Sequence, residues 1–119
     1  PLTDAGVDIF DCSTRRFWEP EFEGSRLNLA GWTRKLTGKP TISVGSVGLK
    51  GDFTNAFDGG PEAEAASVEP LVERLKAGEF DLIAVGRALL ADAEWAEKIR
   101  HAREKEIHLF TKEDLKTLK

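Results

Sequence analysis

The fold is decided by two stretches of the chain, Ser43-Val44-Gly45-Ser46-Val47-Gly48 and Ala84-Val85-Gly86-Arg87-Ala88-Leu89-Leu90. Each contains a short apolar run that ends at a glycine, which is typical of a buried strand followed by a chain reversal. In a (β/α)8 barrel, the loops after strands 7 and 8 offer backbone N–H groups to a phosphate at the C-terminal face. The pair therefore predicts a phosphate cradle, to which Arg87 adds a positive charge.

Strands and helices alternate around these two stretches. Short runs rich in β-branched and aromatic residues predict strands at 7–12, 41–44 and 80–85. Apolar spacings of three and four, with candidate caps, predict helices at about 27–37, from 67, from about 93 and at about 111–115. A β-α-β-α-β order suits parallel strands joined by helices, so we expect an α/β fold.

Particular residues set the expected helix ends and faces. Leu29, Trp32 and Leu36 form one apolar face, and Gly38 and Pro40 stop that helix. The later signals are a cap at Ser67, an apolar stripe at Leu71, Val72 and Leu75, a stop at Gly78, a turn at 87–91, a cap at Asp92 and a capped start at Thr111. The segment 45–67 is glycine-rich, and we expect a mobile loop there with a turn at Asp58-Gly59-Gly60.

Length and charge limit the class of protein. The chain has 119 residues, whereas an eight-stranded barrel of this kind needs about twice as many. We therefore expect residues 1–119 to form a single partial barrel domain. A net charge of −4 argues against a nucleic-acid partner, and no apolar run approaches the length of a membrane span. The lone Cys12 cannot form an internal disulfide, which favours a reducing cytoplasm.

Longer stretches of the sequence match a known family. They are Cys12-Ser13-Thr14-Arg15-Arg16-Phe17-Trp18-Glu19-Pro20-Glu21-Phe22-Glu23-Gly24-Ser25, Leu27-Asn28-Leu29-Ala30-Gly31-Trp32, Val44-Gly45-Ser46-Val47-Gly48-Leu49 and Phe80-Asp81-Leu82-Ile83-Ala84-Val85-Gly86-Arg87. With them the chain closely resembles the bacterial NADH:flavin oxidoreductases of the Old Yellow Enzyme family. The likeness extends over nearly the whole chain and corresponds to the C-terminal portion, about strands 6 to 8 with their helices, of a (β/α)8 TIM barrel.

The resemblance implies a cofactor and a reaction. It places the phosphate of FMN on Gly45, Ser46, Gly86 and Arg87. It implies NADH or NADPH as reductant and a small unsaturated carbonyl compound as substrate, so the full-length parent is expected to be an FMN-dependent oxidoreductase that reduces electron-poor alkenes. The family's His-His or His-Asn pair and its tyrosine proton donor lie earlier in the barrel, and this chain contains no Tyr. We therefore expect no catalytic residue here, and an isolated fragment that is inactive.

Two positions depart from the family pattern. Asp11 stands where close relatives often have His, and a carboxylate there disfavours contact with a phosphate or an electron-rich ligand. Ala93 stands where the family usually has Pro, which costs little because Pro at a helix start only pre-sets φ.

Other chemistry-bearing residues have simpler interpretations. Arg15 and Arg16 are expected to be solvated or paired with Glu19, Glu21 or Glu23. Cys12 is expected to be a small buried hydrophobic residue, and Trp18, Trp32 and Trp95 are expected to pack in the core. His101 and His108 lack neighbours at ligand spacing, so no metal site is predicted.

Two further hypotheses stay open. Three parallel strands leave two open edges and an uncovered inner face, which the N-terminal half of the barrel or self-association would have to cover. If self-association covers them, the chain is a stand-alone, non-catalytic half-barrel module. A different phosphate-binding barrel, acting on a sugar or nucleotide phosphate, would share the cradle, but the match over 15–24 disfavours it.

Overall fold

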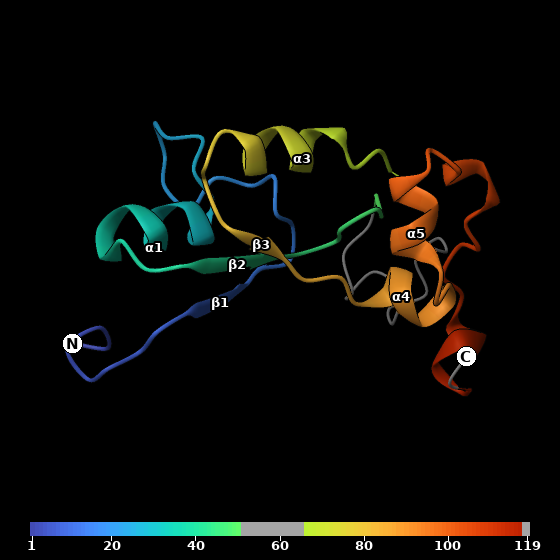
Figure 1. Cartoon of the computed structure of the whole chain (residues 1–119), viewed down its shortest axis with the longest axis horizontal. Helices are drawn as coiled ribbons and strands as arrows, with labels where there is room; N and C mark the ends of the chain where they lie inside the picture. The colour runs from blue at the N-terminus through green and yellow to red at the C-terminus, as the bar shows by residue number, and fades with distance from the viewer. Residues whose placement is uncertain (51–65, 118–119) are drawn as a thin grey trace. The chain divides into compact units, whose positions relative to one another are not determined.

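The computed structural model describes residues 1–50 and 66–117 and has mixed α/β structure (Figure 1). In chain order its elements are β1 (Phe10–Ser13), α1 (Leu29–Thr37), β2 (Thr41–Val44), α3 (Glu69–Lys76), β3 (Leu82–Ile83), α4 (Arg87–Ala91), α5 (Trp95–Arg100) and the 3-10 helices η1 (Glu104–Glu106) and η2 (Lys112–Leu115). The α/β class is confirmed. That the sheet belongs to an eight-stranded barrel remains a prediction, and the predicted turn at 58–60 lies outside the described residues.

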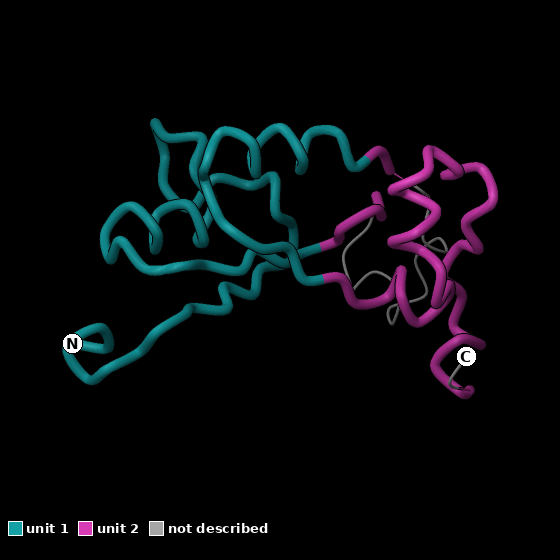
Figure 2. The backbone as a smooth tube through the Cα atoms, viewed as in Figure 1, with its two compact units in different colours: residues 1–45, 68–84 teal, residues 46–67, 85–119 magenta. Residues whose placement is uncertain are grey.

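Two compact units make up the chain (Figure 2). Unit 1 consists of Pro1–Gly45 and Val68–Ala84, and unit 2 of Ser46–Ser67 and Val85–Lys119. Unit 1 contains the three strands with α1 and α3, and unit 2 contains α4, α5, η1 and η2. The chain leaves unit 1 one residue after β2 and again one residue after β3. That all 119 residues form one partial barrel domain stays a prediction.

The three strands form a parallel sheet in the order β1-β2-β3. Strand β1 starts at Phe10, whose N–H donates to the carbonyl of Pro40 at 3.1 Å. The predicted start at residue 7 is therefore wrong. Pro40 has no N–H, so the ladder cannot continue toward earlier residues of β1. Strand β3 is also shorter than predicted, although the N–H groups of Asp81 and Ala84 still donate to β2 on either side of it.

The sheet has one covered and one open face. Thr41 and Ser43 are buried on the face that α1 covers, whereas the alternate residues of β2 are partly exposed. On the open face, Asp11, Ile42 and Leu82 lie in one row across the strands. Leu82 keeps 53% of its surface exposed. The open face therefore has an apolar row with a carboxylate at its β1 end.

Small residues, not the predicted stripe, form the buried side of α1. Ala30 and Gly31 are buried, whereas Leu36 is 75% exposed, so the prediction that Leu36 lies on the covered face is wrong. Small side chains let the helix backbone approach the sheet closely. The predicted stop is confirmed, because Gly38 caps the helix with φ +68° and donates its N–H to the carbonyl of Arg34.

The remaining predictions had mixed outcomes. Val68, not Ser67, is the N-cap of α3, without a side-chain cap bond, and of the predicted stripe Leu71 is the buried residue. Residues 87–91 form the short helix α4 instead of a turn, and α5 begins at Trp95, two residues later than expected. The capped start at Thr111 is confirmed, as a 3-10 helix.

Within the described part of the chain, no helix combines the length and apolar character that crossing a membrane requires.

Candidate functional site

The chain turns sharply where β2 ends. Gly45 is buried and has φ +150°, and Ser46 follows with φ +52°, in the left-handed region that non-glycine residues rarely adopt. A Cβ on Gly45 would lie 2.7 Å from both the carbonyl oxygen and the hydroxyl oxygen of Thr14. The loop after β1 therefore crosses so close to Gly45 that only glycine fits there.

The second reversal follows β3. Gly86 is the N-cap of α4, and its carbonyl accepts the N–H groups of Leu89 at 2.9 Å and Leu90 at 3.2 Å. Among the described residues, no atom would lie within 4 Å of a Cβ built on Gly86. Arg87 begins α4, and its guanidinium carbon lies 5.9 Å from the ring centroid of Phe110, which is a cation–π distance. The Arg87 side chain thus lies partly along a buried aromatic ring.

Unit 2 brings three of the four predicted phosphate ligands together. Arg87 Nη2 donates to Ser46 Oγ at 3.4 Å, although the two residues are 41 positions apart in the chain. Gly86 is bonded to Arg87, and Gly45, the last residue of the first stretch of unit 1, is bonded to Ser46. The two glycine reversals singled out in the sequence therefore meet through the side chains of Ser46 and Arg87.

The chemistry of these residues fits an oxyanion. A guanidinium only donates hydrogen bonds, and its planar fork matches phosphate oxygens. The Ser46 hydroxyl can donate as well, and the open space at Gly86 leaves its backbone accessible. The residues present thus fit the phosphate end of FMN, the group that the family resemblance implies.

The loop between β1 and α1 holds the arginines that precede this site in the sequence. Arg16 Nη1 forms an ion pair with Glu19 Oε1 at 2.6 Å, which confirms the expected pairing. Arg15 is exposed. Phe17 is buried and packs edge-on against Trp18, with ring centroids 5.2 Å apart. The buried Phe17 and its contact with Trp18 therefore hold the loop, and the charged residues beside this pair lie at the surface.

Other reactive side chains have structural surroundings. Cys12 is buried, as expected. His101 lies beside Glu97 on the exposed side of α5, and His108 Nε2 lies 3.5 Å from Asp114 Oδ1. Among residues 1–50 and 66–117, no group of three His, Cys, Asp or Glu side chains is placed to hold a metal ion.

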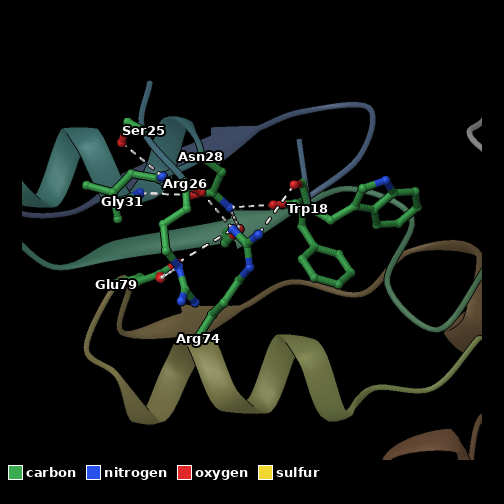
Figure 3. A network of polar contacts seen from close by, with 10 residues as sticks. Trp18, Ser25, Arg26, Asn28, Gly31, Arg74 and Glu79 are labelled. Carbon is green, nitrogen blue, oxygen red and sulfur yellow. Dashed lines mark hydrogen bonds and ion pairs between the residues drawn. The ribbon is translucent and has the colours of Figure 1, made fainter. Parts of the chain in front are cut away.

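Asn28 is a buried hydrogen-bonding residue that was not predicted from the sequence, and it lies in the network of Figure 3. Its side chain accepts the N–H of Gly31 at 2.9 Å and donates to the carbonyl of Phe17 and the hydroxyl of Ser43, both at 3.0 Å. An Asn directly before an apolar helical run is a typical N-cap signal, so its capping role was predictable. Its two other contacts depend on residues distant in the sequence.

Asp92 is a second residue whose full role was missed. Its buried carboxylate accepts Lys98 Nζ at 2.6 Å and the N–H groups of His108 and Glu94 at 2.9 and 3.0 Å. The Lys98 ammonium is the main cause that lowers the pKa of Asp92, and the two N–H groups lower it further, whereas burial acts in the opposite direction. Asp92 thus ties the end of α4 to α5 and to the segment after η1.

No protein-family model matches the chain, and no curated protein matches it significantly.

Proposed function

We propose that this chain is the FMN-phosphate-binding segment of an NAD(P)H-dependent flavin oxidoreductase of the Old Yellow Enzyme type. The observation that supports this most is the contact between Arg87 and Ser46, which joins the two glycine reversals. Cationic and hydroxyl donors gathered at such reversals suit a phosphate monoester. The sequence resemblance adds the flavin and the reaction class.

In this proposal the chain's residues bind and orient the cofactor and do not react. Arg87 and Ser46 hold phosphate oxygens, and the backbone at Gly86 lets the phosphate approach closely. Gly45 contributes indirectly, because it lets the loop after β1 cross close to the end of β2. When bound, FMN would supply hydride transfer from NADH or NADPH to an electron-poor alkene. The proton donor and the residues beside the flavin ring would come from the earlier part of a TIM barrel, of which this sheet would form strands 6 to 8.

The open face of the sheet supports a requirement for a covering partner. Leu82 and Ile42 form an apolar row there, and β1 and β3 are the edge strands of the described sheet. The N-terminal half of the barrel is the covering partner that we propose. Self-association of a non-catalytic module is the alternative that the same observation allows.

Flavin content distinguishes the two. The chain is purified with and without a co-expressed N-terminal barrel half, and the flavin absorbance per polypeptide is measured. Yellow protein that appears when the half is supplied, and that oxidises NADH or NADPH with an α,β-unsaturated ketone, supports the oxidoreductase. Colourless, stable oligomers that never bind FMN support the module, and phosphate binding without flavin preference supports a different phosphate-binding barrel.

A further inference from the structure

The loop after β1 holds two successive carbonyl groups at the end of β2. The N–H and the hydroxyl of Thr14 donate to the carbonyl of Val44 at 3.1 and 2.8 Å. The N–H of Phe17 donates to the carbonyl of Gly45 at 3.1 Å. The loop thus continues the hydrogen bonding of the sheet past the last residue of β2.

The bond from Phe17 has a consequence for the next residue. The carbonyl of Gly45 and the N–H of Ser46 belong to one peptide unit, which is trans, because no cis peptide is present among the described residues. In a planar trans peptide these two groups point in opposite directions. A hydrogen bond that fixes the Gly45 carbonyl therefore also fixes the direction of the Ser46 N–H.

Phe17 is held in turn by Asn28. The Asn28 side chain is 1% exposed, and its amide nitrogen donates to the carbonyl of Phe17 and to Ser43 Oγ, both at 3.0 Å. Its amide oxygen accepts the N–H of Gly31 in the first turn of α1 (Figure 3). Asn28 therefore joins three parts of unit 1: the loop, β2 and α1.

A second brace holds the rest of the loop. Arg74 of α3 donates to the carbonyl of Trp18 at 3.3 Å and to that of Arg26 at 3.2 Å (Figure 3). Its Nη1 also lies 3.6 Å from Glu79 Oε2. Both limbs of the loop are thus tied to the same helix, so the loop that contacts Gly45 is held as a fixed element.

We infer that Asn28 is a positioning residue for the phosphate site: through Phe17 and Gly45 it sets the direction of the Ser46 N–H. This inference rests on the proposed function, since it assigns that N–H to the phosphate. A donor fixed before binding costs no ordering entropy when the anion arrives, so the expected effect is on affinity for the phosphate end of the ligand.

The test compares FMN with riboflavin, which lacks the phosphate. Asn28→Ser keeps an oxygen that can cap α1 but removes the amide that reaches Phe17 and Ser43. Dissociation constants for both flavins are measured by fluorescence on the flavin-binding form of the protein. We expect the preference of the wild type for FMN over riboflavin to fall about tenfold in Asn28→Ser, a change equal to about 1.4 kcal/mol.

Matched variants separate positioning from stability. Leu71→Ala removes a buried side chain of α3 and is expected to destabilise the protein at least as much as Asn28→Ser does. The preference of Leu71→Ala for FMN over riboflavin should stay that of the wild type. Asn28→Asp keeps the side-chain shape and replaces the amide donor by an acceptor, so it serves if the serine variant does not fold. The same fall in preference is expected from it.

Amide hydrogen exchange gives a readout that needs no flavin. In Asn28→Ser, the protection of the Phe17 N–H should fall at least tenfold relative to the N–H of Val72, which donates to the carbonyl of Val68 within unit 1. Unchanged protection of Phe17 together with an unchanged FMN preference would overturn the inference.

The failures can be told apart. If Arg87→Ala loses the FMN preference and Asn28→Ser keeps it, positioning by Asn28 is wrong and the proposed function stands. If the wild type, supplied with its barrel half, does not prefer FMN over riboflavin, the proposed function fails and the inference fails with it.

Discussion

Gly45 and Gly86 follow neighbouring strands of one sheet, yet they differ in what requires a glycine. At Gly45 the fold itself requires a glycine, because φ is +150° and a Cβ would lie 2.7 Å from the backbone of Thr14. At Gly86 neither reason applies, since φ is −101° and a Cβ would meet no atom of the described part of the chain within 4 Å. The chain itself explains the first glycine but not the second.

The difference shows how folding and binding divide between the two reversals. Gly45 lets the loop after β1 cross β2, so its role is structural and the site benefits indirectly. Gly86 lies beside Arg87 with open space around it, which suits a backbone that a ligand approaches closely. Substitutions at the two glycines should therefore separate stability from affinity.

The largest expected effect is at Gly45. Gly45→Ala forces a Cβ against the carbonyl of Thr14 and into a backbone conformation that L residues rarely adopt, so we expect a loss of roughly 2–4 kcal/mol in the free energy of unfolding. Urea denaturation followed by circular dichroism measures it. A loss of less than half the lower end of that range would mean that the loop after β1 moves aside easily. The contrast between Gly45 and Gly86 would then weaken.

Next is Asp92, which anchors the end of α4 opposite Gly86. Asp92→Asn weakens the bond to Lys98 and the acceptance of two N–H groups, so we expect a loss of about 2 kcal/mol at pH 7. Because the pKa of Asp92 is lowered by folding, its contribution is present above the pKa of the unfolded chain, about 3.9, and is lost as pH falls through the folded pKa.

Urea titrations at several pH values test both parts of this prediction. The free energy of unfolding of the wild type should fall more steeply below about pH 4 than that of Asp92→Asn. An equally steep fall of the free energy of unfolding in the two proteins would contradict a lowered pKa of Asp92 in the folded state. Lys98→Ala, which removes the partner instead, should lose about as much stability at neutral pH as Asp92→Asn. Its free energy of unfolding should then fall less steeply below about pH 4 than that of the wild type.

Arg87 should affect affinity more than stability. In the flavin-binding protein, Arg87→Ala should raise the dissociation constant of FMN at least about tenfold and leave that of riboflavin unchanged, because a charge-assisted contact to phosphate is lost. The dissociation constant of FMN for Arg87→Lys should lie between those of the wild type and Arg87→Ala. Arg100→Ala removes an exposed cation of α5 and serves as the control. Equal weakening of both flavins would place Arg87 away from the phosphate.

The smallest effect on stability is expected at Gly86. Gly86→Ala should change the free energy of unfolding by less than about 0.5 kcal/mol, as for a substitution without steric conflict. It should nonetheless weaken FMN binding, because the Cβ occupies space beside the proposed phosphate. A large stability loss with normal FMN affinity would reverse the comparison with Gly45.

Local signals in the sequence predicted much of this architecture. The strand at 41–44, the end of α1 at Gly38 and the capped start at Thr111 depend on neighbouring residues, and all three are confirmed. Predictions failed where a partner decides the outcome. Pro40 limits β1 through its missing N–H on the adjacent strand, and Leu36 is exposed because Ala30 and Gly31 face the sheet.

The sequence by itself determined that two strands end in glycine reversals, one of them followed by an arginine, because strand and turn propensities are local. Tertiary structure alone decided which side chains these reversals bring together. The contact between Arg87 and Ser46 and the link from Asn28 through Phe17 to Gly45 join residues that are 11 to 41 positions apart. Such contacts depend on strand register and loop path, which no local pattern encodes.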